Sequence, residues 1–129
     1  MKNLLDLAEA AALKAHAPYS GFQVGCAFES LFGHVYTGCN VENASYGLTI
    51  CAERNAIFHA VAEEGAEMKI VRLAVSCLGH EFPPCGACRQ VIAEFSLKDG
   101  STQIAFLRQG ELVIQSIAEL LPSQFSLNP

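Results

Sequence analysis

The sequence predicts an α/β fold, and three observations lead to this prediction. Strand-like and helix-like hydrophobic periodicity alternate along the chain. The segment Ile70–Cys77 is nearly all apolar, which is typical of a central strand that helices cover on both faces. The composition is 51% hydrophobic and 16% charged, which is enough apolar material for a full core. The 129 residues fit one compact domain, spanning 1–129.

The first half of the chain predicts a helix, two strands and a second helix. Apolar residues recur at helical spacing from Leu4 to Ala15, behind Asn3 as a good N-cap. Apolar residues then alternate with others over Phe22–Phe28, which predicts a strand with one well-buried face. The remaining elements of this half are a strand over 34–38, a loop over 40–49 and a helix over 51–62 that ends at Gly65.

The second half predicts strand, helix and hairpin in that order. The buried strand 70–77 is followed by a loop that contains two prolines and then by a helix over 88–95. Strands over 103–107 and 112–115 are joined tightly around Gln109-Gly110, as in a hairpin. Ser116 and Glu119 have the spacing of a capping box for a short last helix that ends at Pro122.

Charge and hydropathy exclude two classes of partner. The net charge is -5, from 13 acidic and 8 basic residues, and the basic residues form no cluster, so no nucleic-acid partner is expected. No apolar stretch reaches the roughly 18 to 20 residues of a membrane-spanning helix. Asp6 and Glu9 interrupt the apolar pattern at the start of the chain, unlike a secretory signal, so a cytoplasmic location is expected.

Three cysteines have the arrangement of a metal centre. Cys85 and Cys88 lie one helical turn apart, and Cys51 opens the preceding helix. If both helices flank the intervening strand on the same side, their N-termini converge and bring the three thiolates together. The partial positive charge of a helix N-terminus favours thiolate over thiol. Three protein ligands leave the fourth tetrahedral position for water, which is the pattern of a catalytic zinc site.

Other interpretations of the six cysteines remain open at this point. An exported chain with this even number would form three disulfides, although so apolar a core needs no covalent help. The Cys85–Cys88 pair also fits a thioredoxin-like redox couple. A fourth protein ligand, for which Cys39 and His80 are the foremost candidates, would make the zinc structural, in a binding module without turnover. Cys26 and Cys77 fit plain core residues.

Two charged residues of the second helix are candidates to assist such a metal. Glu53 lies about 200° around an ideal helix from Cys51, so it is poorly placed to share the ion but can reach a metal-bound water and shuttle its proton. A first-turn glutamate that stabilises the helix dipole is the structural alternative. Arg54, three residues after Cys51, faces the thiolates, where its guanidinium would offset their charge.

The motifs resemble the short, homotetrameric type of cytidine deaminase. The residues that carry the resemblance are CAER at 51–54, PCGACRQ at 84–90 and the run TGCNVENASYGLTICAER at 37–54. The resemblance implies a three-layer α/β/α sandwich with a mixed five-stranded sheet. It further implies a cytoplasmic enzyme of pyrimidine salvage that uses one zinc per subunit to hydrolyse cytidine and deoxycytidine to uridine and deoxyuridine plus ammonia. A deaminase for another aminopyrimidine nucleoside, such as a nucleoside antibiotic, is the alternative.

The resemblance also implies roles for individual residues. Zinc would be bound by Cys51, Cys85 and Cys88, with Glu53 as the proton shuttle. The nucleoside would be held by residues from several segments, namely Phe22, Asn40, Glu42, Ala44, Tyr46, Ala52 and Phe125. Among these, Asn40 and Glu42 would hold the ribose hydroxyls, and the Ala52 N–H would meet the pyrimidine carbonyl oxygen. Tyr46 and Phe125 would reach the pocket of a neighbouring subunit, so that the tetramer shares its active sites. A carboxylate such as Glu42 suits a neutral diol and would repel a phosphate, which favours a nucleoside over its monophosphate.

Overall fold

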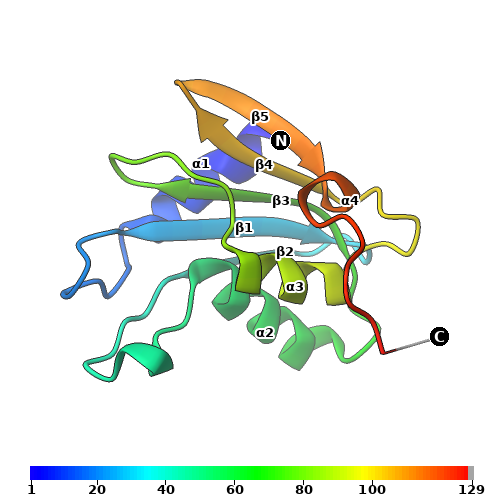
Figure 1. Ribbon diagram of the computed structural model, residues 1–129, viewed down its shortest axis with the longest axis horizontal. Helices are drawn as coiled ribbons and strands as arrows, with labels where there is room; N and C mark the ends of the chain where they lie inside the picture. Colours follow the sequence, from blue (N-terminus) through cyan, green and yellow to red (C-terminus); the bar gives the residue numbers. More distant parts are fainter. Residues whose placement is uncertain (128–129) are drawn as a thin grey trace.

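A computed structural model describes residues 1–127 and contains a mixed five-stranded sheet between two helical layers (Figure 1). One layer is α1, and the other is formed by α2 and α3. The predicted three-layer α/β/α sandwich is thereby confirmed. In chain order the elements are α1 (Lys2–Ala12), β1 (Val24–Ser30), β2 (Val35–Cys39), the 3-10 helix η1 (Tyr46–Leu48), α2 (Ala52–Glu64), β3 (Ile70–Cys77), α3 (Gly86–Glu94), β4 (Gln103–Arg108), β5 (Glu111–Ser116) and α4 (Ile117–Leu120).

The strand order is β2-β1-β3-β4-β5, and only β3 and β4 run parallel to each other. Parallel neighbours require a crossover connection, and the segment that contains α3 provides it. As a result α3 begins beyond the carboxyl end of β3. It packs beside α2 on the same face of the sheet, and both helices lie below the strands in Figure 1.

The sheet presents small residues to α1 and large ones to α2 and α3. On the α1 face, Ala27, Ala74 and Ala105 contact Leu4, Leu5 and Ala8. The approach is closest at Gly25, where an added Cβ would lie 1.8 Å from the Ala8 carbonyl oxygen. On the other face Gly38 allows a similar approach, because a Cβ there would lie 2.6 Å from the Ala56 nitrogen. Because the two glycines lack a Cβ, one helix can pack closely against each face of the sheet.

Several predicted boundaries and one predicted face are wrong. Helix α1 begins at Lys2 with Met1 as its N-cap, so Asn3 is not the cap, and the helix ends at Ala12. Strand β1 begins at Val24 and is covered on both faces, because Gly25 and Ala27 lie beneath α1. The predicted position of Cys85 and Cys88 at the start of the third helix is confirmed, since Cys85 caps α3 by accepting a hydrogen bond from the Cys88 N–H.

The turn chemistry of the chain is confirmed. Gln109 and Gly110 join β4 to β5 with φ values of 53° and 79°, the left-handed conformations that a two-residue hairpin turn requires. Ser116 and Glu119 form the reciprocal capping box at the start of α4. Gly65 ends α2 with φ 82°. Over residues 1–127, no helix combines the length and the apolar character needed to traverse a bilayer.

Candidate metal centre and active site

Three cysteine sulfurs converge where α2 and α3 begin. Cys51 is the N-cap of α2, Cys85 is the N-cap of α3, and Cys88 lies in the first turn of α3. Their Sγ atoms all lie within 4.8 Å of one another. Sulfurs that share a tetrahedral zinc at about 2.3 Å lie about 3.8 Å apart, so the cluster fits this ion with a small contraction. Within residues 1–127 no fourth His, Cys, Asp or Glu joins the group, and Cys39 and His80 are outside it.

The electrostatics of the cluster also fit a cation. Hydrogen bonds from Cys88 and Arg54 lower the pKa of Cys51 to about 5, and the Arg54 Nη2 donor lies 3.1 Å from the Cys51 sulfur. The same contact with Cys51, together with burial, raises the pKa of Cys88 well above its usual range. Thiols this close therefore resist ionising together, whereas a divalent ion would allow all three to be thiolates. The donor set, with Arg54 beside it, suits a metal better than a redox dithiol.

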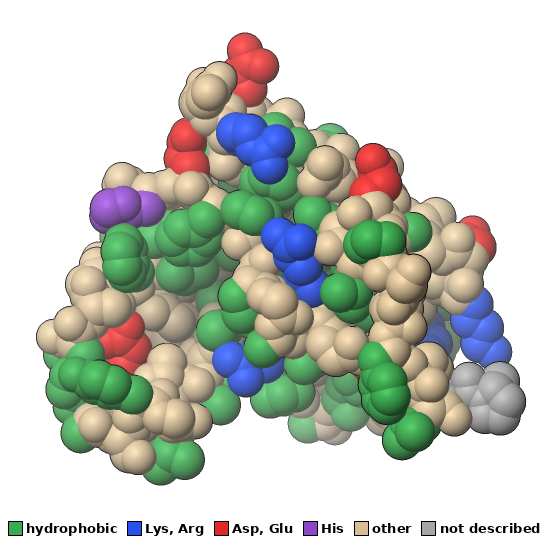
Figure 2. Space-filling model, viewed as in Figure 1, with side chains coloured by type: hydrophobic (Ala, Val, Ile, Leu, Met, Phe, Trp, Pro, Cys, Tyr) green, Lys and Arg blue, Asp and Glu red, His purple; other side chains and the backbone are tan. Residues whose placement is uncertain are grey.

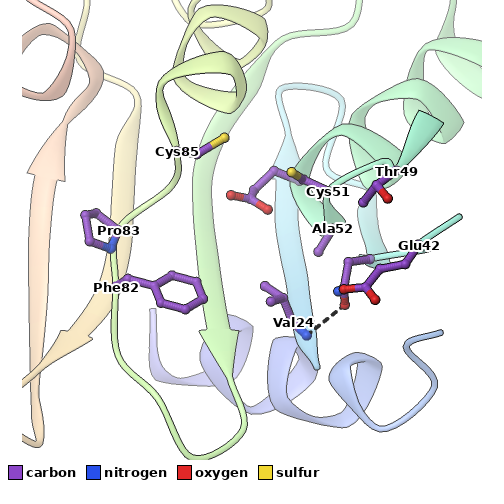
Figure 3. Close-up of a pocket in the computed structure, with 10 residues that line it drawn as sticks. Val24, Glu42, Thr49, Cys51, Ala52, Phe82, Pro83 and Cys85 are labelled. Atoms are coloured by element: carbon purple, nitrogen blue, oxygen red, sulfur yellow. Dashed lines mark hydrogen bonds between the residues drawn. The ribbon is translucent and has the colours of Figure 1, made fainter. Parts of the chain in front are cut away.

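A pocket of about 410 Å³ opens onto this cluster. Figure 3 shows Cys51 and Cys85 at the top of the pocket, Glu42 at its lower right, and Phe82 and Pro83 on the left, across the pocket from Glu42. One cavity therefore contains both the cysteine sulfurs and the Glu42 carboxylate, with Thr49 also in its lining. A volume in this range suits a small organic ligand.

Glu53 is buried at the thiolate end of the pocket. The residue is only 4% exposed and lies in the first turn of α2. Burial raises the pKa of Glu53 to about 7, and the nearby charge of Cys51 acts in the same direction. Glu53 is not a member of the ligand cluster, so its carboxyl group is free to hold or release a proton beside the metal centre.

Asn40 and Glu42 lie in the same pocket, and both are held by backbone groups. Asn40 Oδ1 accepts a hydrogen bond from the Val24 N–H at 2.8 Å, the dashed line in Figure 3. The Glu42 carboxylate accepts the N–H groups of Tyr19 and Ser20 at 2.9 and 3.1 Å, and also the Ser20 hydroxyl. The Ser20 hydroxyl is the main cause that lowers the pKa of Glu42. Glu42 is therefore a fixed negative charge in the pocket.

The remaining predicted residues lie at varied distances from the pocket. Ala52 lines it as the first residue of α2, where backbone N–H groups lack helical partners. Phe22 is adjacent, since its ring stacks edge-on against Phe82 with centroids 6.4 Å apart. The structure does not bring Ala44, Tyr46 or Phe125 into the pocket lining; all three are exposed, and Phe125 borders a different cavity.

Sequence reasoning missed several pocket residues. Val24, Thr49, Phe82 and Pro83 also line the cavity. Proximity along the chain would have found part of this set, because Thr49 precedes a ligand by two residues and Pro83 does the same for Cys85. No sequence signal links Ser20 to Glu42, since the contact depends on how two loops fold together.

The comparison with known families agrees with this geometry. Residues 1–102 match the family model for the cytidine and deoxycytidylate deaminase zinc-binding region. The chain belongs to this family. The matched region includes all three cysteines, so zinc is the cofactor of the centre that they form.

Individual members of the family are similar over most of the chain. A cytidine deaminase from Halalkalibacterium halodurans is 46% identical over 112 residues, which cover 87% of this chain and 83% of that protein. One from Sporosarcina psychrophila is 39% identical over 127 residues, covering 98% and 91%. The crystal structure of cytidine deaminase from Burkholderia pseudomallei superposes with a TM-score of 0.86 at 42% identity, covering 96% of this chain and 98% of that one.

Proposed function

We propose that this chain catalyses the zinc-dependent hydrolytic deamination of cytidine and deoxycytidine to uridine and deoxyuridine plus ammonia. One observation carries the proposal: three cysteine sulfurs lie within 4.8 Å of one another at the end of a pocket that also holds the buried Glu53. The similarity to proteins named cytidine deaminase, at 46% and 39% identity, supports the same reaction.

Zinc bound by Cys51, Cys85 and Cys88 would supply the Lewis acidity that lets water act as a nucleophile near neutral pH. Glu53 moves the protons. Its carboxylate accepts one proton from the attacking water and delivers it to the pyrimidine ring nitrogen, which makes the adjacent carbon electrophilic. It then passes the second proton to the exocyclic amine, which leaves as ammonia. Burial suits Glu53 to this task because its pKa of about 7 lets it give and take protons at neutral pH.

Other residues of the pocket hold the substrate. The Ala52 N–H, at the positive end of α2, would donate to the pyrimidine carbonyl oxygen. Asn40 and Glu42 would bind the ribose hydroxyls at the opposite end of the pocket. Arg54 donates to the Cys51 sulfur and so offsets part of the charge of three thiolates.

The charge of Glu42 favours a nucleoside over a nucleotide. Its carboxylate is deprotonated at neutral pH, since hydrogen bonds hold its pKa below the ordinary value. A sugar diol donates to such a group, whereas a phosphate is repelled by it. Cytidine and deoxycytidine are therefore proposed as substrates, and their monophosphates are not.

A homotetramer with shared active sites is proposed for the assembly, with the whole of residues 1–129 as one catalytic domain. Figure 2 shows hydrophobic side chains gathered along the lower margin of one face, over the segment before α2 and around the C-terminal segment. Tyr46 is 75% exposed and Phe125 is 67% exposed in these two segments. Contact with neighbouring subunits would cover both rings and place them at a neighbour's pocket. A cytoplasmic role in pyrimidine salvage is proposed together with this activity.

Replacement of Glu53 by Gln tests the proposed function. We expect Glu53→Gln to retain one zinc per subunit while turnover of cytidine falls about 10²- to 10⁴-fold, because only proton transfer is lost. Ultraviolet assays with cytidine, deoxycytidine and cytidine monophosphate would be run beside metal analysis. Glu63→Gln, an exposed change on the same helix, is the matched control and should keep the parent rate. Turnover of cytidine by Glu53→Gln at the parent rate would show that Glu53 is not the proton shuttle.

A further inference from the structure

Arg89 joins the metal-binding turn to the C-terminal part of the chain. It follows the ligand Cys88 directly, and its side chain is half-buried on α3. The guanidinium Nε donates to the Pro84 carbonyl at 2.8 Å, and Nη1 donates to the Leu120 carbonyl at 2.9 Å. Pro84 immediately precedes the ligand Cys85, and Leu120 ends α4. The guanidinium of Arg89 therefore links two segments that are far apart in the sequence.

The same residue also holds the carbonyl of the ligand itself. The Arg89 backbone N–H donates to the Cys85 carbonyl at 2.9 Å as part of the α3 ladder. Two consecutive carbonyls, those of Pro84 and Cys85, are thus fixed by the backbone and side chain of one arginine. Cys85 is the exposed member of the three ligands, whereas Cys88 is fully buried. The position of Cys85 therefore depends on these hydrogen bonds more than on surrounding side chains.

The next residue along α3 repeats the link to the C-terminal segment. Gln90 Nε2 donates to the Phe125 carbonyl at 3.3 Å. In Figure 1 the chain after α4 descends beside α3, so both contacts are made along one side of this helix. Arg89 and Gln90 thereby tie the segment from Leu120 to Phe125 to the helix that carries two metal ligands.

We propose that Arg89 is a positioning residue for the metal centre, which holds the turn of Cys85 and couples it to the C-terminal segment. Its role differs from that of Arg54, which donates to a sulfur atom directly. A guanidinium suits the task because it directs several donors in fixed directions, whereas a lysine ammonium is a single point charge. The proposal deepens the proposed function, but its main readout is metal binding and does not depend on deamination.

The test compares Arg89→Ala, Arg89→Lys and the control Arg72→Ala. Arg72 lies on the α1 face of the sheet and pairs with Glu29 at 3.3 Å, remote from the metal centre. Zinc affinity would be measured by chelator competition, and ligand geometry by the thiolate charge-transfer bands of the cobalt-substituted proteins. Groups that hold metal ligands in place typically contribute about 10- to 100-fold in affinity. We expect a loss of this size for Arg89→Ala, with altered cobalt bands, a smaller loss for Arg89→Lys and no change for Arg72→Ala.

Hydrogen exchange tests the coupling to the C-terminal segment. In Arg89→Ala, amides of α4 and of the Cys85 turn should exchange faster together, while those of α1 keep the parent rate. Parent-like zinc affinity and cobalt bands in Arg89→Ala, with only a lower melting temperature, would make Arg89 a purely stabilising residue and overturn the proposal. Should Arg89→Ala not fold, parent-like affinity in Arg89→Lys would overturn it equally. A parent protein that binds zinc but does not deaminate cytidine would refute the proposed function alone.

Discussion

Two carboxylates of the same pocket, Glu53 and Glu42, differ in protonation because their surroundings differ. Burial raises the pKa of Glu53 to about 7, so this residue can exchange protons at neutral pH. Hydrogen bonds led by the Ser20 hydroxyl lower the pKa of Glu42, so this residue stays charged. Paired acids whose environments separate their pKa values mark the division between proton transfer and binding. Glu53 therefore belongs to the reaction and Glu42 to substrate recognition.

Glu42→Gln should weaken substrate binding more than it slows the chemistry. A hydrogen bond to a charged group contributes about 1.5–3 kcal/mol, so we expect the KM for cytidine to rise about 10- to 100-fold with a smaller change in kcat. The preference for cytidine over cytidine monophosphate should also decrease, because the variant lacks the Glu42 charge that repels the phosphate. Steady-state kinetics with both compounds measure the effects. An unchanged KM would contradict the assignment of Glu42 to the sugar.

Glu64, at the end of α2, is a carboxylate outside the pocket with a side chain only 4% exposed. Its Oε2 accepts hydrogen bonds from the hydroxyls of Ser30 at 2.7 Å and Tyr36 at 2.8 Å, and lies 2.9 Å from His34 Nδ1. Burial raises the pKa of Glu64, but these partners outweigh burial and the pKa lies below its ordinary value. Such a group stabilises the fold above its unfolded-state pKa and loses this contribution as the pH falls.

Glu64→Gln should therefore destabilise the protein in a pH-dependent way. We expect the difference in unfolding free energy from the parent to be largest near neutral pH and to shrink as the pH falls below about 4. Urea denaturation of both proteins over this range provides the measurement. The exposed neighbour Glu63, changed to Gln, should show a small difference that does not vary in this way. A Glu64→Gln difference independent of pH would show that the carboxylate charge contributes nothing.

Two relations among the metal residues are well predicted from the sequence because they are local, whereas the approach of Cys51 to Cys85 depends on how α2 and α3 pack on the sheet. Helix geometry places Cys85 and Cys88 one turn apart and lets Arg54 face Cys51, and the 3.1 Å contact between the last two bears this out. Contacts between distant loops follow no such rule. The Ser20 hydroxyl meets the Glu42 carboxylate across 22 positions, and neither residue type nor spacing indicates it.

At the scale of elements, Gly25 and Gly38 determine how closely the helices approach the sheet. The two glycines lie on neighbouring strands and face opposite layers. The alternating pattern predicted that only one face of β1 is buried. In a sequence, small residues such as Gly25 and Ala27 do not indicate a second buried face. They are buried because a helix backbone packs directly on them. The glycines of the hairpin turn and of the α2 C-terminus were better predicted than the Asn3 cap, since Gly110 and Gly65 require only their own left-handed conformation.

Alanine at either glycine should destabilise the fold, with different effects on the metal centre. Overpacking typically costs about 1–3 kcal/mol, and we expect at least this loss for Gly25→Ala and Gly38→Ala. Gly38→Ala should also weaken zinc binding, because its Cβ would press on Ala52 and Ala56 near the start of α2. Gly25→Ala acts on α1 and should leave the zinc affinity of the folded protein near that of the parent.

Urea denaturation and chelator competition distinguish the two variants. Gly47→Ala is a suitable control, since no atom lies within 4 Å of its added Cβ, and it should change stability by less than about 0.5 kcal/mol. Equal zinc affinities in Gly38→Ala and Gly25→Ala would show that the start of α2 does not depend on its contact with β2.

At the scale of the whole molecule, Phe125 lies apart from the pocket of its own chain. It borders a cavity with Lys69 and Glu94, near the far end of α3 from the thiolates. Within one chain it therefore cannot complete the active site. If subunits share their pockets, as proposed, Phe125 contributes to the pocket of a neighbouring subunit. A subunit without this ring can then still have a complete pocket, because its neighbour supplies Phe125.

Mixing two impaired variants tests this sharing. Glu53→Gln keeps Phe125 but lacks the proton shuttle, whereas Phe125→Ala keeps the shuttle but lacks the ring. After subunit exchange, we expect the mixture to turn over cytidine faster than the sum of its two components. Phe125→Ala mixed with Phe125→Ala,Glu53→Gln is the control and should show no gain. A mixture of the single variants without gain, after exchange is verified, would contradict shared pockets.

The ligands also set an order of events during biosynthesis. Cys51 and Cys85 each cap a helix, and the whole of β3 lies between them in the chain. A nascent polypeptide that has emerged only as far as α2 offers Cys51 alone of the three ligands, too few to retain an ion against cellular chelators. Loading with metal therefore has to wait until the start of α3 has emerged, at a stage when the segments that form β4 and β5 still follow in the chain.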